Sequence, residues 1–518
     1  MTSRATQRPD AAELIFYGAV AVLLSALFLW PLWAFEHMGQ PDYPNHLARL
    51  SVLLNQAHPA WHDYLAVTDL KFPNMAVDAV PLFFAHVLGV GPATALKCTA
   101  TVAVLGLAWG TLALACAWQG RLNWLALLAF PMAYNRYFAW GFLGYALAMA
   151  LAMWMVAAWV RLRDMPLDGR LGPWLWRLAF LVGQVALMLS HLAGFGLLWV
   201  AIAGVELARL WQAKRLDAAT RRQWALLIGM LALAFGAYLL LDRCPGLPTH
   251  EQGWTLRSKL AGIRSPFYMY EAMPAMAVAA LFAAGVMVSV KQRLQGGGSW
   301  SALAMAWMPA LCVLAVALVL PFDLMGSYFL DQRLMPFAAL LVLAGCPWMP
   351  QPRALVAFVV GLFLACGLKV EEIHRHWSAA NDTMAEARQA LRALPERARV
   401  VTIVASRLGG LESPSLRHAA LFGLIDRGHV VPNLFAYPYD NFSVRYQAQA
   451  RIDGAFMHYN DLVGPPPADL WPQVCGQYDH VLLTREPDIL NLPACVEVMH
   501  KHAHFWLLKV RHTPASSP

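Results

Sequence analysis

The stretch AELIFYGAVAVLLSALFLWPLW, residues 12–33, decides the fold class of this chain. It is strongly apolar and long enough to cross a lipid bilayer as one helix, which takes about 20 residues. The residues before it are polar and include Arg4 and Arg8, and no small-residue cleavage site follows it. These features predict an uncleaved first transmembrane helix rather than a signal peptide.

The composition predicts many such helices. Hydrophobic residues make up 59% of the 518 residues and charged residues only 14%, whereas about a quarter of a typical soluble domain is charged. The length leaves room for roughly ten membrane spans and a separate soluble domain. The sequence therefore predicts a polytopic α-helical membrane protein.

The net charge of +8 reflects membrane topology rather than nucleic-acid binding. The part from Glu371 to the end is balanced, with 14 Lys and Arg against 15 Asp and Glu. The excess lies in short loops of the apolar part, RLRDMPLDGR (161–170) with Arg177, and RLWQAKRLDAATRR (209–222). Such clusters mark cytoplasmic loops under the positive-inside rule. We therefore expect a lipid bilayer, and no nucleic acid, as a partner.

With those loops in the cytoplasm, the apolar runs predict about eleven crossings, with the N-terminus inside and the C-terminus outside. Two crossings within 178–205 would be short and would meet at an outer turn that holds His191. The segment NMAVDAVPLFFAHVLG (74–89) is expected to dip into the outer leaflet, with a full span as the alternative. The segments expected outside are 34–92, 136–141, the His191 turn, 242–274, 321–333 and everything after 370.

The chain changes character near Lys369, where shorter apolar runs with β-branched residues begin. A helix is expected over 378–395, and strands are expected in ARVVTIVAS (398–406), HVVPNLF (429–435), DHVLLTRE (479–486) and FWLLKV (505–510). We therefore divide the chain into a transmembrane domain, 1–369, with its first periplasmic loop at 34–92, and a periplasmic soluble α/β domain, 370–518.

The predicted soluble domain holds two cysteines, Cys475 and Cys495. In the periplasm they can form a disulfide; the alternative is two unrelated buried thiols. The same domain contains HKHAH (500–504), whose three histidines suit either a metal site or a solvated edge strand. We favour the edge strand.

The stretch PDYPNHLARL (41–50) follows the first span and is unexpectedly polar. If Pro44 opens a helix, then Asn45, His46 and Arg49 share one face, and Leu47, Leu50 and Leu54 share another. Asp42 would stand at the positive end of that helix. The pattern predicts an amphipathic helix on the outer membrane surface, with its apolar face on lipid or protein and its polar face over a cavity.

Other polar residues fall on the same side of the membrane. They are Asn135, Arg136, His191, Arg264, Tyr268, Tyr270, Glu271, Asp323, Asp331 and Arg333. Burying an ionisable side chain at the end of a membrane helix costs free energy, so such residues usually have a function. Arginine suits phosphate and a carboxylate suits a general base, so this set favours an anionic lipid substrate. Several of the polar residues also have a structural alternative. The alternatives are a helix charge for Asp42, lipid anchoring for His46, Arg49 and Arg333, capping of backbone carbonyls by His191, and an ion pair between Arg333 and Asp323 or Asp331.

A span followed by a long outer loop that opens with an Asp resembles the GT-C superfamily of membrane glycosyltransferases, of the aminoarabinose and protein O-mannosyl transferase type. QRLMPF (332–337) before a late span, and the C-terminal α/β domain, add to this resemblance. It implies that Asp42 is the catalytic carboxylate and that Arg333 meets donor phosphate. DLKFPNMAVDAVPLFF (69–84) resembles the family's KPPL segment but reads Lys-Phe-Pro-Asn, which leaves the role of Lys71 open.

The function that this resemblance implies is an inverting transfer of a sugar from a polyprenyl-phosphate donor to an acceptor on the outer, periplasmic face of the bacterial inner membrane. Asn45, His46, Arg49, Asn135, Arg136, His191, Asp331 and Arg333 are the expected substrate-binding residues. A divalent cation, Mg or Mn, is compatible with this chemistry, and the sequence identifies no ligands for it.

The alternative functions are a flippase or transporter for a lipid-linked glycan, and a polymerase or assembly protein for a surface polysaccharide. The chain contains no Walker A, G-x-G-x-x-G, G-x-S-x-G, H-E-x-x-H or C-x-x-C motif, which disfavours ATPases, nicotinamide enzymes and zincins.

Overall fold

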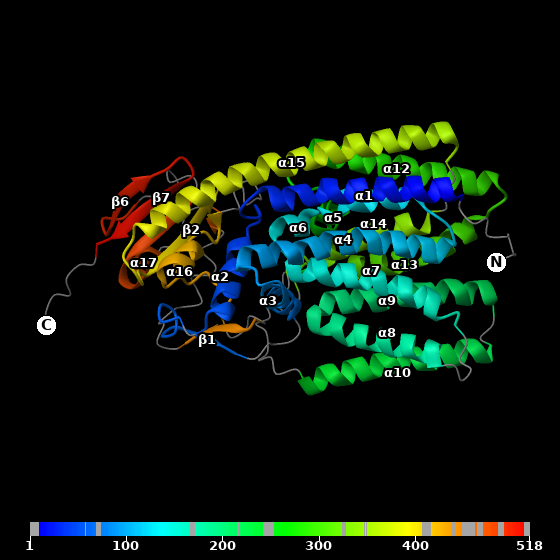
Figure 1. Ribbon diagram of the computed structural model, residues 1–518, viewed down its shortest axis with the longest axis horizontal. Helices are drawn as coiled ribbons and strands as arrows, with labels where there is room; N and C mark the ends of the chain where they lie inside the picture. The colour runs from blue at the N-terminus through cyan, green and yellow to red at the C-terminus, as the bar shows by residue number, and fades with distance from the viewer. Residues whose placement is uncertain are drawn as a thin grey trace. The chain divides into compact units, whose positions relative to one another are not determined.

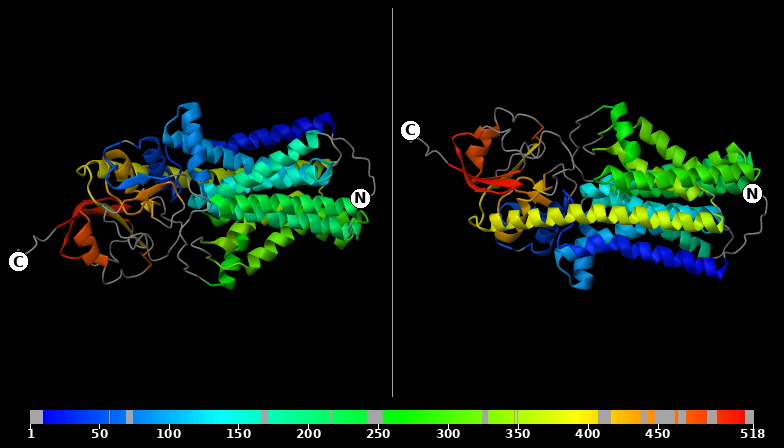
Figure 2. Two further views of the ribbon diagram at one scale, coloured as in Figure 1. Left: turned by 90° about the horizontal axis from the view of Figure 1, so that it is seen from below. Right: turned by 90° about the horizontal axis from the view of Figure 1, so that it is seen from above.

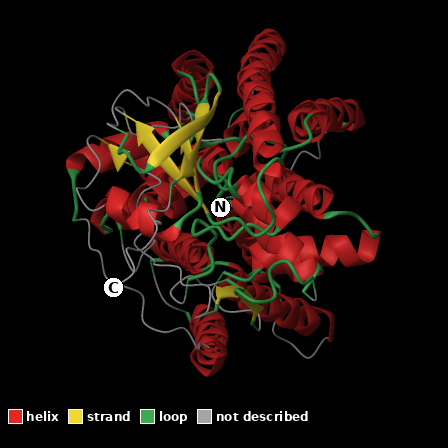
Figure 3. Cartoon of the chain, turned by 90° about the vertical axis from the view of Figure 1, so that its left-hand side faces the viewer, coloured by secondary structure: helices red, strands yellow, loops and turns green. Residues whose placement is uncertain are grey.

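Most of the chain is helical, and strands are few (Figure 3). The computed structural model describes residues 10–56, 58–68, 74–165, 171–214, 217–241, 253–323, 328–346, 348, 350–406, 416–437, 442–447, 462–463, 470–484 and 492–511. The chain forms two compact units. The helical unit comprises Met1–Ala34, Phe72–Ala76 and Thr99–His374, and the mixed unit comprises Phe35–Lys71, Val77–Cys98 and Arg375–Pro518.

Nine helices in the described ranges are long and apolar enough to cross a membrane, as a polytopic membrane protein requires. They are α1 (Ala11–Ala34), α4 (Pro92–Gln119), α7 (Leu143–Leu162), α8 (Leu171–Ser190), α9 (Leu192–Ala213), α10 (Ala218–Leu241), α12 (Ala272–Gln295), α13 (Trp300–Val319) and α15 (Pro352–Arg392). The expectation of two short spans within 178–205 is wrong, because α8 and α9 have 20 and 22 residues. Both extend beyond that range into the stretches that we assigned to the basic loops.

Two of the eleven expected crossings are not among these nine helices. One is replaced by a 3-10 turn, η1 (Trp124–Leu128), and the short helix α5 (Ala129–Ala133). The other is α14 (Leu330–Gly345), which has 16 residues and is mostly buried. The side-chain amide of Asn123, just before η1, donates to the carbonyls of Leu343 (2.9 Å) and Cys346 (3.1 Å) at the end of α14. These short elements therefore pack against one another inside the helical unit.

The segment expected to dip into the outer leaflet forms α3 (Ala76–Leu88), a helix of 13 residues. At 1.5 Å per residue it is about 20 Å long, shorter than the roughly 30 Å hydrocarbon core of a bilayer. The length fits the dipping helix and excludes the full span that we considered as the alternative.

Within the helical unit, α7, α8 and α9 pack against one another, and α10 packs against α8 (Figures 1 and 2). α7 is buried along most of its length, whereas α10 exposes large apolar side chains, including Ile228 (61%), Leu233 (63%) and Leu240 (84%). A bilayer would cover such a surface, so α10 lies at the lipid-facing periphery of this unit and α7 in its core.

The last span does not end where we expected. α15 runs without a break from Pro352 to Arg392, a helix of 41 residues that includes most of the helix predicted over 378–395. No Gly or Pro lies between Gly367 and Pro395, so nothing in this sequence stops the helix. The predicted domain boundary at 369/370 therefore falls inside this helix, close to the division of the two units between His374 and Arg375.

The C-terminal part contains a five-stranded sheet in the order β4-β2-β5-β7-β6. Its strands are β2 (Val400–Ser406), β4 (Leu462–Val463), β5 (His480–Thr484), β6 (Val496–Lys501) and β7 (Phe505–Val510). β2 is parallel to β4 and β5, whereas β7 is antiparallel to β5 and β6. Side chains of β2, β5 and β7 form a core with α17 (Leu470–Gln477). The structure confirms three of the four predicted strands and an edge position for β6, where HKHAH begins.

The fourth predicted strand, HVVPNLF, is not a strand. Only Val430 forms an isolated bridge, to Arg399, and Pro432 and Asn433 lie in a turn. A proline cannot donate a ladder hydrogen bond, and this segment instead carries contacts to the first outer loop, described below.

The first outer loop belongs to the mixed unit rather than to the transmembrane domain. β1 (Leu65–Val67) pairs antiparallel with β3 (Val444–Tyr446), and α2 (Tyr43–Leu54) packs against α16 (Leu421–Arg427). Segments almost 400 residues apart in sequence thus form one unit, so the predicted soluble domain is incomplete without the loop.

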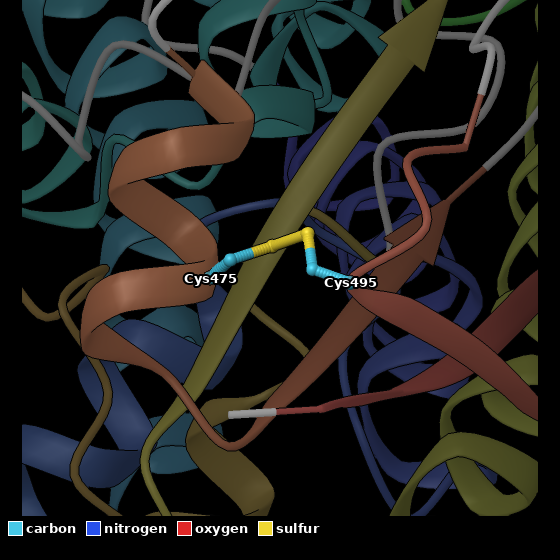
Figure 4. The surroundings of a disulfide bond; sticks show 2 residues. All are labelled: Cys475 and Cys495. Atoms are coloured by element: carbon cyan, nitrogen blue, oxygen red, sulfur yellow. A yellow bond between two sulfur atoms is a disulfide. The ribbon is translucent and has the colours of Figure 1, made fainter. Parts of the chain in front are cut away.

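Cys475 and Cys495 form a disulfide, with Cα atoms 6.3 Å apart (Figure 4). Cys475 lies in α17, and Cys495 directly precedes β6. The bond therefore ties the helix that covers the sheet to the edge strand. Of the two alternatives that we considered for these cysteines, a disulfide and two unrelated buried thiols, the structure shows the disulfide.

Candidate active site

The helix after the first span begins as its sequence predicts. α2 runs over Tyr43–Leu54 with Pro44 in its first turn, and Asp42 precedes it. However, every residue from Tyr43 to Leu53 is buried, so the prediction of a helix lying on the membrane surface is wrong. Leu47 and Leu50 pack on protein, and the polar face is also covered.

Arg49 explains how that polar face can be buried. Its guanidinium bonds to the carboxylate of Asp78 on α3, with Nε to Oδ1 at 3.0 Å, and lies 3.8 Å from the ring centroid of Phe442. The other oxygen of Asp78 accepts from the backbone N–H of Ser443 (3.3 Å). Arg49 is fully buried, which excludes the lipid-anchor alternative. His46, also buried, lies beside it, with Nδ1 3.5 Å from Nη2 of Arg49.

Asn45 connects α2 to the C-terminal part of the chain. Its Oδ1 accepts from the backbone N–H of Phe435 (3.0 Å), and its Nδ2 donates to the carbonyl of Asn433 (2.8 Å). Nδ2 also lies 3.3 Å from Nδ1 of His418. The amide is fully buried and is used within the protein, so this geometry gives Asn45 a positioning role. Substrate binding by Asn45 stays a prediction.

Asp42 does not act as a helix cap. Its side chain makes no capping hydrogen bond to α2, and its Oδ1 lies 3.6 Å from Nε2 of His418. The side chain is 10% exposed. A carboxylate that is largely enclosed, and that makes no capping hydrogen bond to its own helix, is suited to accept a hydrogen bond or a proton from a ligand.

Arg333 lies in an aromatic setting in the helical unit. It is in the first turns of α14, and its guanidinium carbon is 4.2 Å from the ring centroid of Phe142 and 5.8 Å from that of Tyr145. The hydroxyl of Tyr145 donates to the backbone carbonyl of Arg333. The residue before this helix, Phe329, has a left-handed backbone (φ 60°). The hydrogen bond restrains the backbone of Arg333, and the two aromatic contacts restrain its guanidinium group.

His191 has a local capping role, but it caps a backbone N–H group and not the backbone carbonyls that we considered. It lies between α8 and α9, where its Nδ1 accepts from the backbone N–H of Ala193 (3.2 Å) and so caps α9. Burial and, to a smaller extent, the positive charge of Arg333 together lower the pKa of His191 to about 3. The ring is therefore neutral near pH 7 and lies within the electrostatic influence of Arg333.

Asp331 pairs with a residue that we had not selected. Its carboxylate binds Nζ of Lys259 (2.8 Å) and the hydroxyl of Ser258 (2.7 Å), both on α11 (Leu256–Arg264). The observed ion pair is therefore with Lys259 and not the suggested one with Arg333. In the sequence, Lys259 falls within the segment 242–274 that we expected outside the membrane, where no periodic pattern marks it as a partner.

Asn135 and Arg136 occupy the start of α6 (Arg136–Trp140). Oδ1 of Asn135 accepts from the backbone N–H groups of Tyr137 (3.0 Å) and Phe138 (3.3 Å), which makes Asn135 a helix cap. The guanidinium carbon of Arg136 is 5.9 Å from the ring centroid of Tyr268, and that of Arg264 is 5.5 Å from the same ring. Nε of Arg136 is buried and has no hydrogen-bond partner among the described residues.

The predicted site residues thus form two groups, one in each unit. Asp42, Asn45, His46 and Arg49 belong to the mixed unit, and Asn135, Arg136, His191, Asp331 and Arg333 belong to the helical unit. The structure adds His418, Asp78 and Lys259, which sequence reasoning missed. The convergence of Asp42 and Arg333 on one pocket stays a prediction, and Lys71 lies outside the described residues.

No group of three or more His, Cys, Asp or Glu side chains that could hold a metal ion occurs among the described residues. This includes the histidines of HKHAH. The divalent cation therefore stays a prediction, and no step of the mechanism below depends on it.

The chain has a fold similar to that of the solved protein ArnT, as the sequence resemblance to membrane proteins of the aminoarabinose transferase type implied. Two crystal structures of ArnT from Cupriavidus metallidurans, one apo and one bound to undecaprenyl phosphate, match at 13% identity with TM-scores of 0.52 and 0.53. Each match covers 96% of this chain and 97% of ArnT. Arabinofuranosyltransferase AftD from Mycobacteria matches at 14% identity and a TM-score of 0.48, over 98% of this chain and 40% of AftD. No protein-family model and no curated protein matches the chain.

Proposed function

We propose that this multi-pass membrane protein is an inverting glycosyltransferase that moves a sugar from a polyprenyl-phosphate donor to a hydroxyl acceptor on the periplasmic face of the bacterial inner membrane. The observation that carries the proposal is the carboxylate of Asp42, which is enclosed, makes no capping bond to α2 and lies 3.6 Å from His418. The ArnT fold covers nearly the whole chain, and ArnT has been solved with undecaprenyl phosphate bound. That lipid class is the donor we carry over to this protein.

Asp42 is the general base in this mechanism. It takes the proton of the acceptor hydroxyl while the acceptor oxygen attacks the anomeric carbon of the sugar. The bond between that carbon and the phosphate oxygen breaks on the opposite face, so the anomeric configuration inverts. Polyprenyl phosphate leaves with the bonding electron pair, and the proton remains on Asp42 until it is released to solvent.

The helical unit contains arginines that are suited to bind a phosphate. Arg333 is held against Phe142, and Arg136 and Arg264 both approach Tyr268. Guanidinium groups bind phosphate with charge-assisted hydrogen bonds, and a phosphate would supply the buried Nε of Arg136 with an acceptor. The negative charge that develops on the phosphate in the transition state is stabilised most where arginines are fixed in advance.

The test compares Asp42→Asn with Asp63→Asn in proteoliposomes. The donors are synthetic polyprenyl-phosphate pentoses and hexoses, the acceptors are bacterial membrane lipids, and released polyprenyl phosphate is measured. We expect Asp42→Asn to lower transfer by a factor of about 10² to 10⁴, the usual contribution of a general base, with binding of undecaprenyl phosphate unchanged. Asp63 is exposed and pairs with Arg397 (2.6 Å), so its Asn variant should transfer normally. Normal turnover by Asp42→Asn would rule out the assignment.

A further inference from the structure

We propose that His418 is a positioning residue for Asp42, held in one tautomer by Asn45. The inference rests on the proposed function of Asp42 and adds a residue 376 positions further along the chain. All three residues lie in the mixed unit. The argument begins with the amide of Asn45, because its orientation decides where the proton of His418 lies.

The amide of Asn45 can take only one orientation. Its Oδ1 accepts from the backbone N–H of Phe435 (3.0 Å), and its Nδ2 donates to the backbone carbonyl of Asn433 (2.8 Å). A flipped amide would place a donor against the N–H and an acceptor against the carbonyl. Two backbone groups with opposite requirements therefore fix the positions of nitrogen and oxygen.

The second hydrogen of Nδ2 then faces His418. The distance from Nδ2 to Nδ1 of the imidazole is 3.3 Å. Since Nδ2 can only donate, Nδ1 must accept, and the single ring proton of the neutral imidazole lies on Nε2. The ring also makes an edge contact with Phe435, with centroids 5.2 Å apart, and His418 is 2% exposed. These contacts leave the imidazole little freedom to turn.

The Nε2–H of His418 faces the carboxylate of Asp42. Nε2 lies 3.6 Å from Oδ1 of Asp42, which is about 0.5 Å beyond a normal hydrogen bond. Catalytic hydrogen bonds are often long in the absence of substrate and shorten in the complex. Because the side chain of Asp42 makes no bond to its own helix, His418 is what orients it. One carboxylate oxygen is then engaged by Nε2–H, and the other is left to accept the proton of the acceptor hydroxyl.

The experiment separates positioning from structure. His418→Phe keeps the ring shape and the contact with Phe435 but loses Nε2–H, whereas His418→Gln retains an N–H donor at a similar reach. With the polyprenyl-phosphate donors described above, we expect His418→Phe to lower kcat about 10- to 100-fold, as a misplaced catalytic group does, with the KM for donor unchanged. His418→Gln should recover most of the lost kcat. Buried His429, whose Nε2 donates to the carbonyl of Pro395 (3.1 Å), supplies the control: at pH 7.5 His429→Gln should leave kcat unchanged.

The outcomes distinguish this inference from the proposed function. If the wild-type protein transfers no sugar, or if Asp42→Asn transfers normally, the proposed function fails. If Asp42→Asn is inactive but His418→Phe keeps normal kcat, only the role of His418 is overturned. The same conclusion follows if His418→Gln is no better than His418→Phe. Should the Phe variant not fold, His418→Ala with added imidazole replaces it: recovery of kcat by imidazole supports the inference, and its absence in a folded protein overturns it.

Discussion

Two buried histidines of the mixed unit make its stability depend on pH. Burial lowers the pKa of His37 and of His429 to about 4 in each case, whereas an unfolded histidine titrates near 6.5. Below pH 6.5 the unfolded chain therefore binds more protons than the folded one, and stability falls as the pH drops from about 6.5 to 4. His429→Gln should make this decline shallower in thermal unfolding of the purified protein between pH 8 and pH 4. An unchanged decline would contradict the prediction, and His500→Gln, at an exposed position, is the control.

Arg333 is predicted to contribute to donor binding as well as to turnover. Arg333→Ala should weaken binding of undecaprenyl phosphate to the detergent-solubilised protein by about tenfold or more, because a charge-assisted contact to phosphate is lost. Arg333→Lys should restore only part of the affinity, since an ammonium lacks the planar fork and the stacking on Phe142. Arg353, an exposed residue at the start of α15, provides the matched Arg→Ala control. Equal affinity of Arg333→Ala and the wild type would remove Arg333 from the phosphate site.

The sequence can show that a polar residue occurs in an unusual place, but it cannot show which group its side chain contacts. Asn135 and His191 stand at helix starts, where the same side chain can cap the backbone or bind a ligand. The structure shows that both cap. The partners of Asn45 and Asp331 were not predictable for another reason. His418, Asn433 and Lys259 are remote in sequence, and only the folded chain brings them close.

At the scale of elements, the amphipathic pattern of α2 was recognised correctly and its surroundings were not. Periodicity separates an apolar face from a polar face, but it does not say that water or lipid covers the polar one. The partner of Arg49 is Asp78, which lies in the apolar segment that we expected to dip into the membrane. A strong long-range ion pair can therefore bury a face that looks exposed in the sequence.

This buried ion pair leads to a prediction of stability. Removing one partner leaves the other charge buried and unpaired, which typically costs about 3–5 kcal/mol. Arg49→Met and Asp78→Leu should each lower the thermal stability of the full-length protein strongly, while the double variant should lose less than the sum of the two. Thermal unfolding of the four proteins of this cycle measures the coupling. Additive losses would show that the two side chains do not stabilise α2 as a pair.

For the other elements too, features that depend on neighbouring residues were predicted correctly, whereas features that depend on distant segments were not. Hydropathy identified the long spans because a window of about 20 apolar residues is a local property. It overestimated η1–α5 and α14, which are apolar because they are buried in protein. β2, β5 and β7 were recognised from their alternating or β-branched runs, but the order β4-β2-β5-β7-β6 depends on pairings between distant segments.

At the scale of the whole molecule, the mixed unit is built from both ends of the chain. The first outer loop supplies Asp42 and Asn45, and the C-terminal part supplies His418 and Asn433. The pairing of β1 with β3 adds a second connection between the same two segments. The C-terminal part therefore supplies His418, the residue that we propose positions the general base Asp42. For this reason the C-terminal part cannot be treated as a separate domain.

The last prediction concerns the side of the membrane on which the mixed unit lies. The basic loops around 161–170 and 209–222 are expected in the cytoplasm, and the disulfide between Cys475 and Cys495 requires an oxidising compartment. These two arguments are independent, and both predict that the C-terminus lies in the periplasm, where a lipid-linked sugar donor would be used. An alkaline phosphatase fusion at Ser517 should therefore be active, whereas a fusion in the loop at 295–299 should be inactive. Cys475 and Cys495 should resist maleimide labelling in the denatured protein until a reductant is added. An inactive fusion at Ser517, together with two freely labelled cysteines, would invert the topology and remove Asp42 from the side on which we propose that transfer occurs.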